Sequence, residues 1–170
     1  MITQQDGQQH MNNIYLAYST SHLPLSPIIK MRTGSEYSHI ALVLEPNVPT
    51  DSSLIIESTF ARGGVNIATL RAFKKRAATW RITKLDEQIP DFQKLIDLAL
   101  KEDGFGYDFS GAIGLGFNRD WGSIEDSFCT ELVAYIFREL KMKTMDGANP
   151  HWISTKDCEN WPQTLICKSE

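Results

Sequence analysis

Three residues whose side chains could together perform nucleophilic catalysis are widely separated in this chain: His39, Glu57 and Cys129. A thiol becomes a strong nucleophile when a nearby base removes its proton, and a third group fixes the tautomer of that base. Such a set attacks an amide or ester carbonyl and forms an acyl-enzyme that water resolves. The chemistry requires the three side chains to meet, so it depends on the elements that carry them.

Cys129 precedes residues with the apolar spacing of a helix. Asp126 and Ser127 are good N-cap residues, so we expect the helix to begin there and Cys129 to lie in its first turn. In that turn, free backbone N–H groups and the positive dipole end favour a thiolate and can hold an oxyanion. A second interpretation stays open: a cysteine on the apolar face of a helix is often a small core residue. The apolar positions are Leu132, Val133, Ile136, Phe137 and Leu140.

His39 is the one histidine of four that stands at the start of a buried strand. Residues 38–44, SHIALVL, are almost continuously apolar, which is typical of a central strand. Residues 54–60, LIIESTF, form the next predicted strand, in which Glu57 is the only ionisable residue. A hydrogen-bonded core histidine is the alternative role for His39.

The loop between these strands sets how His39 and Glu57 pair. A loop centred near Val48 places the two residues directly opposite each other. A loop centred on Pro49 places His39 opposite Thr59 and makes Glu57 a diagonal neighbour. Either register keeps the histidine and the carboxylate on one face, about 4.5–8 Å apart.

The remaining pattern predicts an α+β fold in one domain over residues 1–170, with residues 1–13 as a mobile tail. We expect an antiparallel sheet of about five strands, with the Cys129 helix packed against it. Further strands are expected at 14–19 and 80–85, and a strand end at 65–67. Helices are expected at 28–33, at 69–77, from 90 to about 104, and after the S-x-x-D capping box at 154–157.

The bulk composition excludes several classes of function. The 170 residues are 42% hydrophobic and 22% charged, with a net charge of −4, which gives no basic footprint for nucleic acid. The basic run 71–76, RAFKKR, is explained by a solvated helix face. No apolar run approaches about 18 residues, so we expect no membrane-spanning segment.

The cysteines and the amino terminus bear on the cellular setting. Three cysteines without tight spacing give neither a disulfide framework nor a zinc motif, and we expect no metal or other cofactor. The polar amino terminus lacks the order of a signal peptide, so we expect a cytoplasmic protein. A redox-sensor role would require Cys158 or Cys167 to approach Cys129. Nothing in the sequence sets an oligomeric state.

Four short segments resemble the permuted papain-like hydrolases, the YiiX-like branch of the NlpC-type superfamily, distantly related to lecithin:retinol acyltransferase. They are 38–43, SHIALV; 56–58, IES; 107–109, YDF; and 128–133, FCTELV. In that family the histidine strand precedes the cysteine helix, the reverse of the order in papain. Thr130 stands where serine is usual and Phe128 where tyrosine is frequent, but neither departure removes a reacting group.

The resemblance implies a circularly permuted, NlpC-type papain-like fold and a role for each matching residue. Cys129 would be the nucleophile, His39 the general base and then acid, and Glu57 the group that orients the imidazole. Tyr107 would donate to the oxyanion, unless it is a core aromatic residue, and the oxyanion and substrate side would also include Phe128 and Asp108.

The implied function is hydrolysis of an amide or peptide bond through a thioacyl-enzyme, with a peptide, amide or acyl substrate. One alternative is a lipid thioesterase or acyltransferase of the lecithin:retinol acyltransferase type. The other is a non-catalytic binding domain on the same scaffold.

Overall fold

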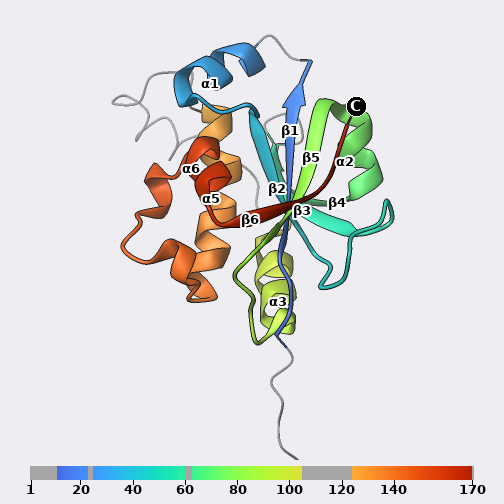
Figure 1. Cartoon of the computed structure of the whole chain (residues 1–170), viewed down its shortest axis with the longest axis vertical. Helices are drawn as coiled ribbons and strands as arrows, with labels where there is room; N and C mark the ends of the chain where they lie inside the picture. The colour runs from blue at the N-terminus through green and yellow to red at the C-terminus, as the bar shows by residue number, and fades with distance from the viewer. Residues whose placement is uncertain (1–10, 23–24, 60–62, 105–123, 170) are drawn as a thin grey trace, which may run out of the picture.

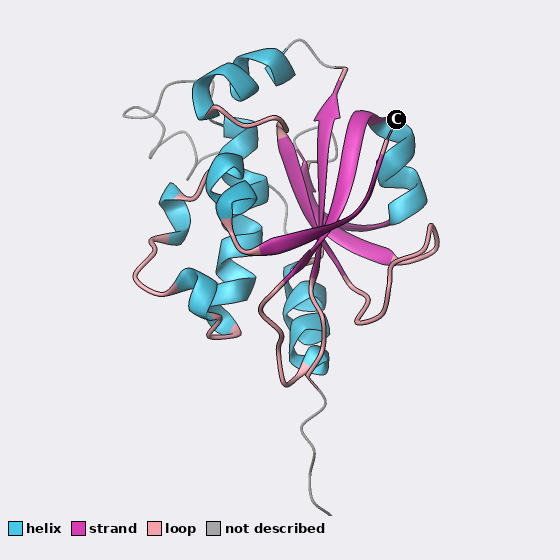
Figure 2. Ribbon diagram, in the orientation of Figure 1, coloured by secondary structure: helices cyan, strands magenta, loops and turns pink. Residues whose placement is uncertain are grey.

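A twisted antiparallel sheet forms the centre of the molecule (Figures 1 and 2). The computed structural model describes residues 11–22, 25–59, 63–104 and 124–169, and within them the sheet has six strands in the order β4-β3-β2-β1-β5-β6. The strands are β1 Tyr15–Ser21, β2 His39–Val43, β3 Leu54–Thr59, β4 Gly64–Thr69, β5 Ala77–Leu85 and β6 Gln163–Lys168. This confirms the predicted α+β fold with its antiparallel sheet, although about five strands were expected.

Helices follow or connect these strands in the order of the chain. They are α1 Leu25–Thr33, α2 Leu70–Arg76, α3 Phe92–Glu102, α5 Ile124–Glu139 and α6 Thr155–Asn160, with short 3-10 turns η3 Lys143–Met145 and η4 Pro150–Trp152. The capping box predicted before α6 is confirmed: Ser154 accepts a hydrogen bond from the Asp157 backbone, and the Asp157 side chain accepts one from the Ser154 backbone.

The alternation of side chains along the strands divides the core between the two faces of the sheet. Leu16, Tyr18 and Ile40 belong to the larger cluster, which contains buried residues of α3, α5 and α6. Tyr15, Ala17, Ala41, Val43 and their neighbours belong to a second cluster, which is closed by Leu70 and Phe73 of α2. Because successive strand residues point to opposite faces, α2 and α5 lie on opposite sides of the sheet, as Figure 1 shows.

Two parts of the described chain differ from the sequence-based expectations. Asn12, which we assigned to the mobile tail, forms an isolated β-bridge with Ile89, and the Asn13 side chain bonds to Pro46 O. Backbone amides pair regardless of side-chain polarity, so a polar composition did not reveal this anchoring. The edge strand β6 was not predicted, since its side chains are mostly exposed and lack a clear apolar alternation.

In the part of the chain that the structure describes, no helix is both long enough and apolar enough to span a bilayer.

Candidate active site

His39 occupies the first position of β2, next to β1. It pairs with Ser19 of β1, and the preceding Ser38 N–H donates to Ser19 O at 3.0 Å, which fixes the backbone where the strand begins. The imidazole lies 5.9 Å from the Phe73 ring of α2, and 18% of its side chain is exposed. The site therefore borders solvent at the histidine.

Glu57 of β3 is the carboxylate that meets this imidazole. Leu42 pairs with Ile56 and Val43 with Ile55, which is the register expected for a loop centred on Pro49. His39 and Glu57 are therefore diagonal neighbours, and Nε2 of the histidine lies 3.0 Å from Oε2 of the glutamate. The Glu57 side chain is 0% exposed.

Arg76 is a third charged group at the same place, and the sequence analysis missed it. Its Nη2 donates to Glu57 Oε1 at 2.5 Å. Arg76 ends α2 three residues after Phe73, so both side chains lie on the side of the helix that faces the sheet. A sequence signal for Arg76 did exist: Leu70 and Phe73 are buried at a spacing of three, and the same spacing leads to position 76. We had instead assigned the whole basic run to a solvated helix face.

These contacts control the charge of the carboxyl group. Burial raises the pKa of Glu57, but hydrogen bonds and charges from His39 and Arg76 outweigh it and bring the pKa below its usual value. Glu57 is therefore ionised at neutral pH. An ionised carboxylate only accepts hydrogen bonds, so Nε2 of His39 carries a proton toward it.

Cys129 reaches the same imidazole from the other side of the sheet. It lies buried in α5, which packs against β2 and β3, and it shares a side-chain hydrogen bond with His39. Because Nε2 faces Glu57, Nδ1 is the ring nitrogen left for the thiol. Burial alone would lower the pKa of His39, but its hydrogen bonds to Cys129 and Glu57 raise the pKa above the ordinary value.

The expected position of Cys129 within its helix is wrong. Helix α5 begins at Ile124, so Cys129 lies in the second turn rather than the first. Asp126 and Ser127, which we expected to cap the helix, lie inside it. Residue types that favour an N-cap do not by themselves fix where a helix begins. The contact with His39, rather than a free helix end, is the feature that distinguishes this thiol.

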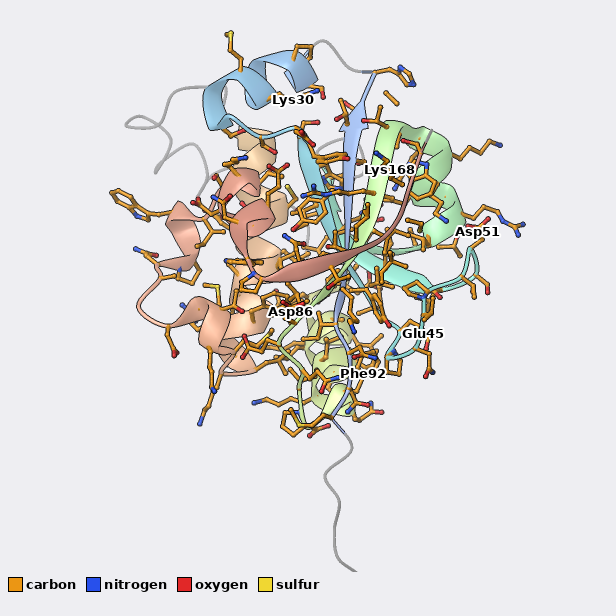
Figure 3. The ribbon with its side chains drawn as sticks, viewed as in Figure 1. Lys30, Glu45, Asp51, Asp86, Phe92 and Lys168 are labelled. Atoms are coloured by element: carbon orange, nitrogen blue, oxygen red, sulfur yellow. The ribbon has the colours of Figure 1, made fainter. Side chains whose placement is uncertain are left out.

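The other predicted site residues are not part of the described site. Tyr107 and Asp108 lie outside the described residues. The backbone of Phe128 belongs to α5, while its side chain lies outside the description. Glu45, a carboxylate labelled in Figure 3, is not a partner of His39: it lies beyond the last residue of β2 and accepts a hydrogen bond from Asn47 through Oε1.

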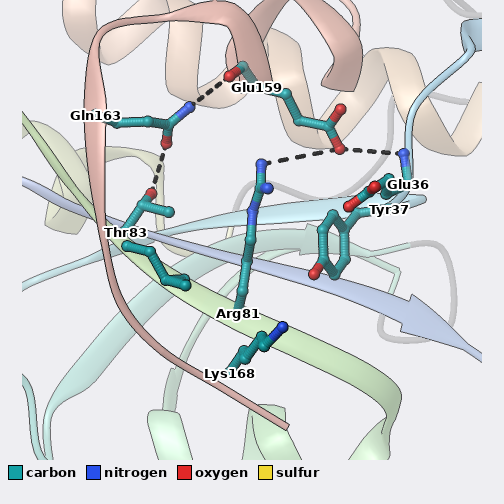
Figure 4. Close-up of a pocket in the computed structure, with 8 residues that line it drawn as sticks. Glu36, Tyr37, Arg81, Thr83, Glu159, Gln163 and Lys168 are labelled. Carbon is teal, nitrogen blue, oxygen red and sulfur yellow. Dashed lines mark hydrogen bonds and ion pairs between the residues drawn. The ribbon is translucent and has the colours of Figure 1, made fainter. Parts of the chain in front are cut away.

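A separate hollow of about 290 Å³ opens between α6, β5 and β6 (Figure 4). Its central residue is Arg81, whose guanidinium lies 4.5 Å from the Tyr18 ring and 4.8 Å from the Tyr37 ring. Glu159 on its wall already accepts hydrogen bonds from the Ser35 hydroxyl and the Glu36 backbone. None of His39, Glu57 and Cys129 lines this hollow, so it is distinct from the catalytic candidate.

Cys129, Cys158 and Cys167 form no disulfide. Within the described residues, no group of three or more histidine, cysteine, aspartate and glutamate side chains is arranged to hold a metal ion.

A family model and a solved structure match this chain. The sequence model of the family described as permuted papain-like amidase enzyme, YaeF/YiiX, C92 family, matches residues 14–159, which include His39, Glu57 and Cys129. No curated protein matches the chain.

One solved structure with a similar fold is the metalloprotein yiiX from Escherichia coli O157:H7. The two share 17% sequence identity with a TM-score of 0.62, over 93% of this chain and 97% of that chain. At this identity the likeness supports a common fold. Since the family model covers most of the sequence, the chain belongs to the YaeF/YiiX family of permuted papain-like amidases.

Proposed function

We propose that this protein is a cysteine amidase in which Cys129 is the nucleophile, His39 the general base and acid, and Glu57 the orienting carboxylate. The observation that carries the proposal is one imidazole that hydrogen-bonds both a buried carboxylate and a thiol. The family's description as amidases supports an amide bond as the substrate.

The proposed reaction begins with transfer of the Cys129 proton to Nδ1 of His39. The sulfur attacks the amide carbonyl carbon, and the C–N bond then breaks as the imidazolium gives its proton to the leaving amine. The acyl group remains on sulfur as a thioester. Water attacks this thioester with His39 again acting as base, which releases a carboxylic acid and restores the thiol.

Glu57 would serve this cycle by fixing the tautomer of His39. Its ionised carboxylate keeps a proton on Nε2, so that Nδ1 is the ring nitrogen that takes up the thiol proton. The same charge stabilises the imidazolium that forms during attack. Tyr107 remains the proposed oxyanion donor, with Phe128 and Asp108 on the substrate side.

The test compares hydrolysis of acyl-amide and peptide libraries by the wild type and Cys129→Ala. We expect Cys129→Ala to abolish turnover while changing the free energy of unfolding by no more than about 1–2 kcal/mol. The matched control is Cys167→Ala, which removes a partly exposed thiol of β6 and should leave turnover intact. Glu57→Gln should lower turnover by roughly 10- to 100-fold, because hydrogen bonds to charged groups are worth about 1.5–3 kcal/mol.

A second measurement follows the thiols directly. Iodoacetamide at mildly acidic pH, followed by mass spectrometry, should modify Cys129 faster than Cys167, and His39→Ala should remove the difference. Equal labelling of the two cysteines that His39→Ala leaves unchanged would contradict an activated thiol. Gross unfolding of Cys129→Ala would favour a packing role, and turnover of thioesters without any turnover of amides would contradict the amidase proposal.

A further inference from the structure

We propose that Arg76 is a positioning residue of the active site, which keeps Glu57 ionised and aligned so that His39 presents the correct tautomer to Cys129. The inference rests on the proposed function, because it assigns Arg76 a role in that same site. The candidate triad then becomes a series of four interacting side chains: Arg76 of α2, Glu57 and His39 of the sheet, and Cys129 of α5.

The two oxygens of Glu57 have different partners. Oε2 lies 3.0 Å from His39 Nε2, and Oε1 lies 2.5 Å from Arg76 Nη2. A carboxylate held at both oxygens cannot rotate without losing one contact. Arg76 therefore fixes the direction in which Glu57 faces the imidazole.

The charge of Arg76 matters as much as its geometry. A buried carboxylate without a cation tends to take up a proton, because burial disfavours its charged form. A protonated Glu57 would donate to Nε2, which would move the imidazole proton to Nδ1. A neutral ring that carries its proton on Nδ1 has no lone pair there to take up the thiol proton.

In the described part of the chain, the ion-pair partners of Glu57 are His39 and Arg76. Its partner on β4 is the uncharged Asn66, and the remaining charged neighbour is His39 of β2, which in turn contacts Cys129 of α5. On α2 itself, Arg71 and Lys74 pair with Asp51 instead. Arg76 thus shares the compensation of the buried charge with His39, and it is the partner that stays charged when the imidazole gives up its proton.

Helix α2 makes this contact specific. Phe73 packs beside the His39 ring, and Arg76, one turn later, reaches Glu57 while 38% of its own side chain stays exposed. A guanidinium keeps its proton throughout the physiological range, so it compensates Glu57 at any working pH.

The test uses Arg76→Gln and Arg76→Met, which remove the charge, and Arg76→Lys, which keeps it. Arg71→Met is the matched control, since Arg71 lies on the same helix with 76% of its side chain exposed and its nearest carboxylate oxygen 3.9 Å away. The ¹³C shift of the Glu57 carboxyl carbon is followed from acidic to neutral pH. This signal reports the ionisation of Glu57 without requiring turnover.

We expect both neutral variants to raise the titration midpoint of Glu57 by about one pH unit or more, as loss of an adjacent opposite charge does. The midpoint should remain close to that of the wild type in Arg76→Lys and unchanged in Arg71→Met. The acidic limb of the pH profile of amide turnover should move upward by a similar amount in the neutral variants. At mildly acidic pH this gives a loss of about tenfold or more, equivalent to about 1.4 kcal/mol.

A double-mutant comparison tests whether Arg76 acts through Glu57. In a Glu57→Gln background, Arg76→Gln should cause no further shift of the acidic limb, because the carboxyl group through which it acts is gone. An equal loss in both backgrounds would show an independent structural effect and overturn the proposal.

Two further results would overturn it. One is an unchanged Glu57 midpoint in a folded neutral variant, and the other is a uniform loss of turnover at all pH values without a shifted limb. A wild type that turns over no amide would refute the proposed function, but the Glu57 titration would still decide whether Arg76 holds the carboxylate ionised. Failure of the proposed function and failure of the role of Arg76 therefore give different results. If either Arg76→Gln or Arg76→Met does not fold, the other can still be compared with the wild type.

Discussion

The imidazole of His39 is the group that joins the other two residues of the candidate site. One ring nitrogen faces the buried carboxylate of Glu57, and the ring also bonds the thiol of Cys129. Both contacts favour the protonated ring, so the folded state holds the proton more tightly than an exposed histidine does.

This coupling predicts how stability changes with pH. The pKa of His39 is raised in the folded protein, so its contribution is complete below the unfolded value of about 6.5 and is lost as pH rises through the folded pKa. We expect the stability advantage of the wild type over His39→Gln to be larger near pH 5.5 than near pH 8.5. The loss is at most about 1.4 kcal/mol per pH unit.

Urea unfolding of both proteins at the two pH values measures this difference. Glu57 has the opposite pH dependence. Its pKa is lowered in the folded protein, so its contribution to the free energy of unfolding is present above the unfolded pKa and is lost as pH falls through the folded pKa. A wild-type advantage that grew between pH 5.5 and pH 8.5 would contradict the raised pKa of His39.

At this scale the sequence predicted the contact between His39 and Glu57 but not the whole site. A short hairpin leaves few registers, so two residues on adjacent strands can be paired from loop length alone. Arg76 was missed because a run of basic residues hides which one turns inward, and only the packing of α2 on the sheet decides that. The prediction that Cys129 lies in the first turn of its helix was also wrong, because where a helix begins depends on its surroundings more than on the cap residue types.

The elements were more predictable than the contacts between them. Strands β1, β2 and β3 are short apolar runs with turn residues between them, and these local signals sufficed to predict them. Strand β6 lacks such a signal because it pairs with β5 alone at the sheet edge, and its side chains face mostly solvent. Its place follows from backbone pairing, which sequence patterns do not show.

The capping box of helix α6 is a local sequence signal whose effect on stability can be measured. Ser154 caps it by accepting from the Asp157 N–H at 3.2 Å and donating its hydroxyl to Asp157 Oδ2 at 2.7 Å. We expect Ser154→Ala to lower the free energy of unfolding by about 0.5–2 kcal/mol, the usual cost of losing an N-cap. Chemical denaturation followed by circular dichroism measures the change.

The matched control for this substitution is Ser52→Ala. Ser52 is exposed in the loop after β2, where its hydroxyl contacts only Thr50 among the described contacts. Its removal should change stability by less than about 0.5 kcal/mol. Equal effects of the two substitutions would show that the capping box contributes nothing to the stability of α6.

Over the whole molecule, one sheet separates two apolar layers of unequal size. The larger layer packs α3, α5 and α6 against Leu16, Tyr18 and Ile40, and the smaller one packs α2 on the other face. Most of the buried apolar surface therefore belongs to the face that α5 covers.

A substitution in the larger layer should therefore have a large effect on global stability. Phe137 of α5 is 0% exposed and lies 5.5 Å from the Trp161 ring. We expect Phe137→Ala to lower the free energy of unfolding by about 3–5 kcal/mol, because it removes buried contacts and leaves a cavity.

Trp152→Ala is the aromatic control, since that side chain is 79% exposed in η4 and its loss should cost less than about 0.5 kcal/mol. Urea titrations followed by circular dichroism compare the two variants. Similar destabilisation by both would mean that α5 is not packed into the core as described.

The sheet also separates the parts of the candidate site, since Cys129 comes from the α5 side whereas Phe73 and Arg76 come from the α2 side. A newly synthesised chain would bring Cys129 to His39 only when both layers have docked. Partly folded forms would then carry an ordinary cysteine, and would be poor catalysts toward other proteins while maturation is incomplete.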